Sequence, residues 1–398
     1  MIGPMVLSPD LAARVRALPA AGALLDVLPE AWVVGGAVRD LLLGGTPEDL
    51  DVVIEGDAVA AARRLADALE GELVVHDRFG TATVAAAGHV YDLATARAET
   101  YAAPGALPDV RPGTVEEDLL RRDFTVNAIA VAGDGRIAAA PSAFEDLDAR
   151  VLRVLHARSF VDDPTRLLRL VRYATRLGFA VEPSTAALAD DAVRGGALAT
   201  VTPTRVGGEL RLLLREPSAL PALAWVGAWE GAPLGVAFSL DAALADRALS
   251  LSPPDGRRDL LLLGSAVRSV PSARLGAWLD ALGFAARDRD TVLTCAQAEG
   301  IAGRLTGAEK PSEIAAVARG APLEAVALAG ALGAEGPARA WLSDLRHVSL
   351  AIDGADLLAA GVPQGEAVGR GLAAALRARL DGDAPDRDAQ LAAALAAA

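Results

Sequence analysis

The sequence is poor in the residues that build disulfides and zinc sites. Its 398 residues include one cysteine and four histidines, and aromatic residues make up only 4% of the chain. The single cysteine, Cys295, excludes an internal disulfide, and it has no Cys or His partners at ligand spacing, which excludes a structural zinc site. Any metal would therefore be held by carboxylates, which favours Mg²⁺ or Mn²⁺.

Long apolar runs are also missing. Charges or helix breakers interrupt every stretch of about 20 residues, so a membrane span is not expected. The N-terminus lacks a basic region followed by a long apolar core, so a signal peptide is not expected either. With 52% hydrophobic and 23% charged residues, the sequence predicts a globular, cytoplasmic protein of several compact domains.

The net charge of −14 argues against nucleic-acid binding as a first interpretation, because phosphate contacts need local positive potential. The charge is unevenly distributed, however. Residues 150–176 contain seven arginines and only two carboxylates, Asp162 and Asp163. This segment is locally basic. Lys310 is the only lysine, so a genome-wide preference for arginine explains the pattern as well as phosphate recognition does.

Up to about residue 140 the sequence mixes strand and helix patterns. Residues 58–69 have helical spacing, and the runs on either side of Gly88 predict a β-hairpin. The expected strands are 31–34, 50–54, 81–87, 89–94 and 124–131. Together these patterns predict a small domain with a mostly antiparallel or mixed sheet.

After about residue 140 the pattern is helical only. Asp163 and Pro164 provide a cap and a first-turn proline, and apolar residues then recur at helical spacing as far as Gly178. Further helices are expected at 183–192, 203–214 and 218–229, with breaks at 253–256 and 309–311. The expected fold class is therefore α+β, a mixed-sheet domain followed by an all-helical C-terminal region.

Two glycines, Gly35 and Gly36, lie between the first predicted strand and a helical segment. Such a turn lets backbone N–H groups approach an anion closely, and Arg39 adds positive charge one turn further on. Taken alone, the pattern is equally typical of an ordinary tight turn.

Asp49 and Asp51 stand at the start of the next predicted strand. Their i, i+2 spacing projects both carboxylates from one face, which suits two metal ions a few ångströms apart. A third carboxylate is expected on a neighbouring strand. Asp92 is the first candidate and Glu99 the substitute. The alternative for each acid is a solvated position on the sheet surface.

Arg122, Asp123 and Asn127 gather at a predicted helix-to-strand junction, next to Arg121. Guanidinium groups beside an acid and an amide can hold phosphates and a ribose hydroxyl through charge-assisted hydrogen bonds. A capping and salt-bridge cluster is the alternative.

A later cluster places charged groups along one predicted helix. Arg166 and Arg169 share a face, whereas Arg172 is turned away from it. Asp163 lies three residues before Arg166, so a carboxylate and a guanidinium can present one planar edge to a nucleobase. Surface salt bridges are the alternative interpretation.

The order of these four segments resembles the class II tRNA nucleotidyltransferase and bacterial poly(A) polymerase family, within the polymerase β superfamily. The resemblance covers roughly residues 30–215. It implies a polymerase-β-like nucleotidyltransferase head at 1–140, a helical neck for nucleobase recognition at 141–216, a helical body at 217–310 and a helical tail at 311–398.

The resemblance also implies roles for particular residues. Gly35, Gly36 and Arg39 would bind the triphosphate, and Asp49 and Asp51 would hold the metals. The remaining nucleotide-binding residues would be Arg122, Asp123, Asn127, Asp163, Arg166, Arg169 and Arg172. Of these, Asp163 and Arg166 match the family's acid-x-x-Arg element, in which side chains replace a nucleic-acid template. Asp162 departs from the family pattern, since Glu is usual there.

The implied activity is template-independent addition of CCA, or part of it, to the 3′ end of tRNA from CTP and ATP, with Mg²⁺ or Mn²⁺ as cofactor. Members that add only A or only CC share these motifs, and residues 101–112 look more like the A-adding branch. Poly(A) synthesis, a non-catalytic RNA-binding protein and a DxD-containing phosphohydrolase are the remaining alternatives.

Overall fold

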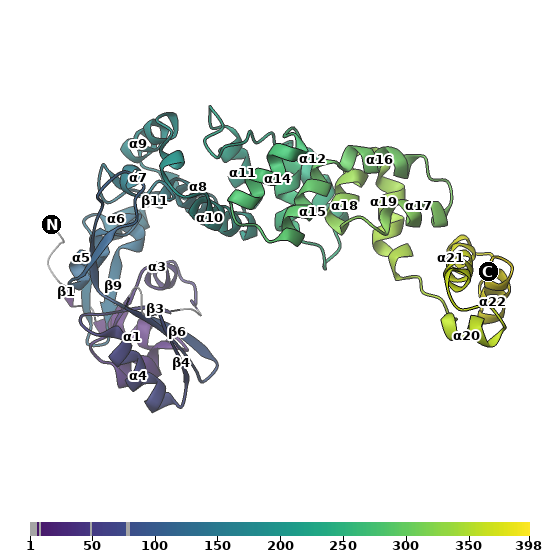
Figure 1. The fold of residues 1–398 in the computed structure, drawn as a ribbon. Coiled ribbons are helices and arrows are strands. Elements are labelled where there is room, and N and C mark those ends of the chain that lie inside the picture. The colour runs from purple at the N-terminus through teal and green to yellow at the C-terminus, as the bar shows by residue number, and fades with distance from the viewer. Residues whose placement is uncertain (1–5, 8, 48–49, 77–79) are drawn as a thin grey trace. The chain divides into compact units, whose positions relative to one another are not determined.

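The computed structural model describes residues 6–7, 9–47, 50–76 and 80–398. It divides into two compact units, Met1–Thr202 and Pro203–Ala398 (Figure 1). All of the described strands lie in the first unit, and the described part of the second contains helices and loops. The predicted division of the chain into head, neck, body and tail remains a prediction.

The first unit is built on one mixed sheet. Eight of the described strands form it, in the order β1-β10-β9-β2-β3-β6-β5-β4. Neighbouring strands are antiparallel except β3 and β6, which are parallel. The strands are β1 (Val6–Leu7), β2 (Trp32–Val34), β3 (Leu50–Ile54), β4 (Glu72–His76), β5 (Thr81–Ala86), β6 (His89–Thr95), β9 (Ile129–Ala132) and β10 (Arg136–Ala139). The mixed sheet confirms the predicted fold class.

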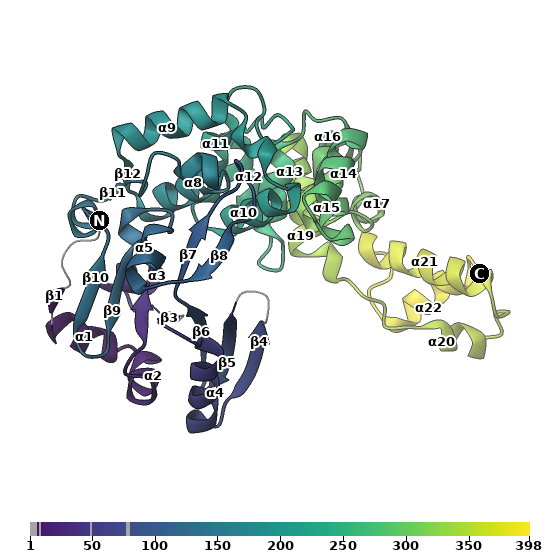
Figure 2. The ribbon, with the colours of Figure 1, turned by 60° about the vertical axis from the view of Figure 1, so that its left-hand side comes forward.

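Two small sheets and short helices complete this unit. The small sheets pair β7 (Arg97–Thr100) with β8 (Asp109–Pro112) and β11 (Val151–Leu152) with β12 (Ala180–Val181). The helices are α1 (Pro9–Arg16), α2 (Ala21–Val27), α3 (Gly36–Leu42), α4 (Ala58–Leu69), α5 (Val115–Leu120), η1 (Thr125–Asn127), α6 (Ala143–Asp148), α7 (Ser159–Asp162), α8 (Arg166–Leu177), α9 (Pro183–Arg194) and η2 (Ala197–Thr200). In Figure 2, α4 lies against strands β5 and β6, which it contacts.

Helix α5 brings a predicted site segment to the sheet. At its start the Thr114 hydroxyl accepts from the Glu117 N–H, and the Glu117 carboxylate accepts from the Thr114 N–H. Val115 and Leu119 of this helix are buried in one cluster with Trp32 and other side chains of the sheet. Because this packing fixes α5 on the sheet, the residues that follow its C-terminus are fixed as well.

The prediction of a strand at 124–131 is partly wrong. The strand begins only at Ile129, because Thr125–Asn127 form the 3₁₀ turn η1. In this turn the Asn127 N–H donates to the Phe124 carbonyl at 3.0 Å, and the Asn127 amide donates to Asp123. Hydrogen bonds within this turn thus replace the strand-to-strand hydrogen bonds that the prediction assumed for residues 125–127.

The helix predicted from Asp163 starts later than expected, at Arg166. Asp163 Oδ1 accepts from the N–H of Thr165 at 3.1 Å and from its hydroxyl at 2.6 Å, which holds an Asx-type turn ahead of the helix. The predicted end is confirmed, since Gly178 caps the helix with a φ of 66°. The two-residue strands β11 and β12 also correct the expectation that this region is helical only.

Two hydrophobic clusters lie within the described part of the second unit. The larger packs helices between Leu244 and Leu342, and the smaller joins Ile352, Leu357, Ala375 and Ala394. The helices are α10 (Pro203–Arg215), α11 (Ala219–Gly227), α12 (Ala242–Leu251), α13 (Arg258–Ala266), α14 (Ser272–Ala281), α15 (Ala286–Ala296), α16 (Ala298–Thr306), α17 (Pro311–Ala318), α18 (Leu323–Ala329), η3 (Gly330–Ala334), α19 (Glu335–Ser343), η4 (Leu345–His347), α20 (Gly354–Ala359), α21 (Glu366–Asp381) and α22 (Arg387–Leu395).

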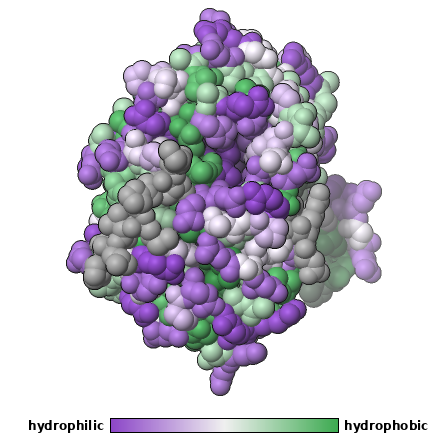
Figure 3. All heavy atoms as spheres, turned by 90° about the vertical axis from the view of Figure 1, so that its left-hand side faces the viewer, coloured by the Kyte–Doolittle hydropathy of each residue, from purple (hydrophilic) through white to green (hydrophobic). Residues whose placement is uncertain are grey.

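Within the described ranges, no helix combines the length and the apolar character needed to cross a bilayer. On the face shown in Figure 3, hydrophobic residues are interspersed with hydrophilic ones. Single exposed apolar side chains of this kind do not require a binding partner.

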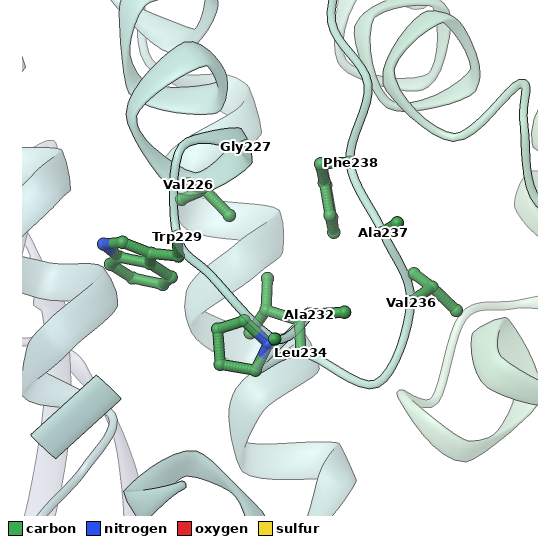
Figure 4. Close-up of a pocket in the computed structure, with 10 residues that line it drawn as sticks. Val226, Gly227, Trp229, Ala232, Leu234, Val236, Ala237 and Phe238 are labelled. Carbon is green, nitrogen blue, oxygen red and sulfur yellow. The ribbon is translucent and has the colours of Figure 1, made fainter. Parts of the chain in front are cut away.

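A pocket of about 200 Å³ follows α11 in the second unit (Figure 4). Val226, Trp229, Leu234 and Phe238 are among its lining residues, none of which is charged. The Trp278 indole N–H donates to the Leu234 carbonyl at 2.6 Å and holds this loop. Such a lining does not suit a triphosphate, so the polar clusters of the first unit are the better candidates.

Candidate active site

Gly35 lies at the centre of the candidate site. It joins β2 to α3 with a φ of 70°, and its N–H donates to the Ile129 carbonyl at 3.1 Å. A Cβ atom at this position would lie 2.6 Å from Nη1 of Arg122 and 3.6 Å from Oδ2 of Asp51. The glycine therefore leaves room for the Arg122 guanidinium, and the Asp51 carboxylate also lies close to the turn.

Asp51 and Asp92 lie opposite each other on the parallel strands β3 and β6. Paired residues of neighbouring strands project to the same face, and both acids are exposed between buried neighbours. The Thr83 hydroxyl donates to Oδ1 of Asp92 at 2.7 Å, which orients that carboxylate. Two carboxylates thus share one face of the sheet, and carboxylate oxygens are ligands that Mg²⁺ and Mn²⁺ accept.

Asp49 lies outside the described residues, so its place beside Asp51 stays a prediction. Glu99 lies on β7, outside the main sheet, and its carboxylate is already paired with arginines. Asp92 is therefore favoured over Glu99 as the third carboxylate. In the part of the chain that the structure describes, no three His, Cys, Asp or Glu side chains cluster as a metal site.

Asp118 holds both arginines that follow α5. Its Oδ1 accepts from Nε and Nη2 of Arg121 at 2.9 and 2.7 Å, and its Oδ2 accepts from Nη2 of Arg122 at 3.1 Å. Asp118 is fully buried, so its own position is fixed by the surrounding packing. Its hydrogen bond to Arg122 therefore holds that guanidinium beside Gly35. Asp118 was not predicted from the sequence. Its position in α5, three residues before Arg121 and four before Arg122, is the signal that would have found it.

A chain of polar side chains, buried except for the half-buried Arg169, joins four predicted site residues. Arg39 Nη1 donates to Asn127 at 2.5 Å, and the Asn127 amide donates to Asp123 at 2.9 Å. The second oxygen of Asp123 lies 2.7 Å from Nη2 of Arg169. Arg39 is only 2% exposed and also donates to Asp40. The structure thus places Arg39 inside this network, and its contact with a triphosphate stays a prediction.

The pKa of Asp123 is lowered in the folded protein. Burial acts to raise it, but the charge of Arg169 and the hydrogen bond from Asn127 outweigh that effect. A carboxylate whose folded pKa is depressed stabilises the fold above its unfolded pKa. That stabilisation is lost as the pH falls through the folded value.

Asp123→Asn is expected to lower the free energy of unfolding by about 3 kcal/mol at pH 7, because the charges that faced the carboxylate lose their partner. Chemical denaturation of both proteins measures this. The difference should shrink below about pH 3.9, where the unfolded carboxyl binds its proton. A difference that is the same at pH 7 and pH 3 would show that the charge of Asp123 is not responsible.

Arg166, at the start of α8, is tied to two neighbouring segments. Its Nη1 donates to the Ser159 hydroxyl at 2.7 Å, and its Nη2 donates to the Arg121 carbonyl at 2.6 Å. It is 4% exposed. Asp163 precedes it in the turn described above, and Asp162, at the position where the family usually has Glu, pairs with Arg158 at 2.8 Å. Asp163 and Arg166, the two predicted base-recognition residues, thus lie at the junction between α7 and α8.

Tyr173 is a further residue that was not predicted from the sequence. The guanidinium groups of Arg172 and Arg39 lie 4.6 and 5.3 Å from the centre of its ring, within cation–π range. The ring also meets Phe124 edge-on at 6.0 Å. Arg39 of α3 and Arg172 of α8, both predicted to bind the nucleotide, therefore pack against the ring of Tyr173. Its place in an arginine-rich helix, as one of three tyrosines in the chain, is the signal in the sequence.

Residues 31–153, which contain every strand of the main sheet except β1, match the family model described as Poly A polymerase head domain. An A-adding tRNA nucleotidyltransferase of Halalkalibacterium halodurans is 43% identical over 222 residues, which cover 53% of this chain and 52% of that protein. A CC-adding tRNA nucleotidyltransferase of Deinococcus radiodurans is 43% identical over 193 residues, 47% of this chain and 50% of that protein. The match thus spans about half the length of these curated relatives.

A solved structure extends the likeness along the chain. The complex of a CCA-adding enzyme with ATP has a TM-score of 0.81 and 27% identity, and the match covers 99% of both chains. Residues 31–153 thus match a Poly A polymerase head domain, and the chain is similar along its length to the CCA-adding enzyme.

Proposed function

We propose that this protein is a cytoplasmic, template-independent tRNA nucleotidyltransferase that adds CCA, or part of it, to the tRNA 3′ end from CTP and ATP. The observation that carries the proposal is the meeting of Asp51, Gly35 and Arg122, with Asp92 opposite Asp51 on the next strand. The relatives named above, which add nucleotides to tRNA, and the ATP complex of the similar structure support it.

Asp51 and Asp92, together with the predicted ligand Asp49, would hold Mg²⁺ or Mn²⁺. The two described members of this donor set fit, since Asp51 and Asp92 are carboxylates paired on neighbouring strands of the sheet. When bound, the metal ions lower the pKa of the attacking 3′-hydroxyl and stabilise the leaving oxygens.

Side chains of the chain itself supply binding and orientation. Arg122, held by Asp118 beside Gly35, is placed to bind phosphate oxygens. Asp123 and Asn127 would hold the ribose, with Arg39 fixing the orientation of the Asn127 amide.

Asp163 and Arg166 would select the base by hydrogen bonding to its edge. Two of the five N–H donors of the Arg166 guanidinium go to Ser159 and to the Arg121 carbonyl, which holds its plane in one orientation.

A second candidate is the addition of A alone. The resemblance of residues 101–112 to the A-adding branch favours it, as do the A-adding relatives at 41–43% identity.

Extension of two tRNA transcripts, one lacking CCA and one ending in CC, tests the proposal with each labelled triphosphate. Full CCA addition extends both transcripts, A addition extends only the CC-ended one with ATP, and CC addition extends only the other with CTP. A long run of A would instead identify a poly(A) polymerase. Incorporation into neither transcript in the presence of Mg²⁺ contradicts the proposal.

A further inference from the structure

Glu99 gathers three hydrogen-bond donors at a point where strand β7 meets the end of α5. Its Oε1 accepts from Nε of Arg97 at 3.0 Å and from Nη1 of Arg121 at 3.4 Å. Its Oε2 accepts from the Tyr101 hydroxyl at 2.9 Å. The Glu99 side chain is only 6% exposed, so these contacts are largely shielded from water. None of the family roles described above includes Glu99 as a partner of Arg121.

Arg121 connects this cluster to the base-recognition segment. Its guanidinium is held between Glu99 and Asp118, so the side chain is fixed from two sides. Its backbone carbonyl accepts from Nη2 of Arg166 at 2.6 Å. Arg121 is the residue that caps the C-terminus of α5, where no further helical turn constrains that carbonyl. The orientation of the carbonyl therefore depends on what holds the Arg121 side chain.

Tyr101 links the same cluster to Asp163 and Arg166, the two residues proposed to select the base. Burial raises the pKa of Tyr101 well above its ordinary value, and the charge and hydrogen bond of Glu99 raise it too. The charges of Arg166 and Asp163 also act on this phenol, in opposite directions. The charges of Glu99, Asp163 and Arg166 therefore all act on the Tyr101 hydroxyl.

We propose that Glu99 is a positioning residue for nucleotide selection: it fixes Arg121 at the end of α5, and the Arg121 carbonyl in turn fixes Arg166. The inference rests on the proposed function. Its physical basis is that a buried carboxylate accepts from three donors, whereas an amide at the same place presents N–H groups to some of them. The neutral side chain of a Glu99→Gln variant would therefore leave Arg121 held by Asp118 alone, and the carbonyl that accepts from Arg166 would be less firmly fixed.

The experiment compares the four ribonucleoside triphosphates on a tRNA that the wild-type protein extends. Glu99→Gln is expected to lower the ratio of kcat/KM for the correct over the incorrect triphosphate about tenfold. The Mg²⁺ concentration that gives half the maximal rate should not change, because a positioning role gives Glu99 no contact with the metal.

A double variant shows whether Glu99 acts through Arg166. Arg166→Ala alone should lower selectivity, and adding Glu99→Gln to it should lower selectivity no further, since the group that Glu99 positions is gone. Additive losses in the double variant would overturn the inference, as would full selectivity in Glu99→Gln. A raised Mg²⁺ requirement with intact selectivity would also overturn it and would make Glu99 a metal ligand instead.

Glu30→Gln is the matched control. Glu30 also pairs with an arginine, Arg64, but it lies between α2 and β2 and is more exposed, so selectivity should be unchanged. Should Glu99→Gln fail to fold in thermal unfolding, Glu99→Asp takes its place. Its shorter side chain withdraws from Arg121, and selectivity is expected to fall in the same way; full selectivity would overturn the inference.

Wild-type extension is measured first, so that two failures remain distinct. No extension by the wild-type protein removes the proposed function. Normal extension by the wild-type protein together with an unaltered selectivity of the Glu99→Gln variant removes only the positioning role.

Discussion

Asp51→Asn is expected to lower nucleotide incorporation about a thousandfold, which corresponds to several kcal/mol of lost transition-state stabilisation. The Asp51 carboxylate lies beside Gly35, opposite Asp92 on the next strand. An amide keeps the shape of the side chain but lacks the charge that a divalent ion requires. Single-turnover extension of tRNA with labelled CTP and ATP measures the effect.

The fold of this variant should be unchanged, because Asp51 is exposed on its strand and an amide keeps the shape of its side chain. Asp67→Asn, on the exposed side of α4, is the matched control and should keep the wild-type rate. The same loss is expected for Asp49→Asn. Near-normal incorporation by a folded Asp51→Asn protein would remove Asp51 from the metal site.

Gly35→Ala is expected to lower kcat/KM for the triphosphate about a hundredfold, since it displaces Arg122, the charged group that we propose binds phosphate. The new methyl group would lie 2.6 Å from Nη1 of Arg122, well inside contact distance, so the guanidinium has to move. The loss should appear mainly as a higher KM, measured by steady-state extension over a range of triphosphate concentrations.

Gly44→Ala separates this effect from backbone strain. Gly44 has a φ of 88°, similarly unfavourable to alanine, but nothing lies within 4 Å of the position of its Cβ atom. Each variant should lose about 1 kcal/mol of unfolding free energy from the positive φ. Only Gly35→Ala should lose triphosphate binding. Equal kinetic losses in both variants would show that the contact with Arg122 is not responsible.

Local patterns were sufficient to predict several elements of the fold. The predicted helix at 58–69 has the bounds of α4, because Asp57 caps it by accepting from the Ala60 N–H and its small apolar residues face inward. The hairpin about Gly88 was also predicted, since β5 and β6 alternate buried and exposed residues. In both cases the interactions that define the element lie close together in the sequence.

Other strands depend on partners far along the chain. Residues 72–76 form β4 at the sheet edge, where every side chain is at least partly exposed, so no buried periodicity marks it. Residues 136–139 form β10, whose antiparallel pairing with β9 and β1 is what makes it a strand. Neither strand was predicted from the sequence, because tertiary pairing outweighs local preference there.

The candidate site divides in the same way. The sequence predicted which residues carry the chemistry, and the structure brings three of them, Gly35, Asp51 and Arg122, close together. It did not indicate how they are held. The Arg39–Asn127 hydrogen bond joins residues 88 positions apart, and no spacing rule along one helix or strand predicts such a contact.

Extension of tRNA with simultaneous measurement of pyrophosphate is the decisive test of the proposed chemistry. A tRNA lacking its 3′ CCA is incubated with the protein, CTP, ATP and Mg²⁺. The mass of the intact RNA is then measured by mass spectrometry. We expect a mass gain of whole nucleotides, one pyrophosphate released for each, and neither product when the divalent ion is chelated. Triphosphate hydrolysis without a gain in RNA mass, or tRNA binding without any chemistry, would contradict nucleotidyl transfer by this protein.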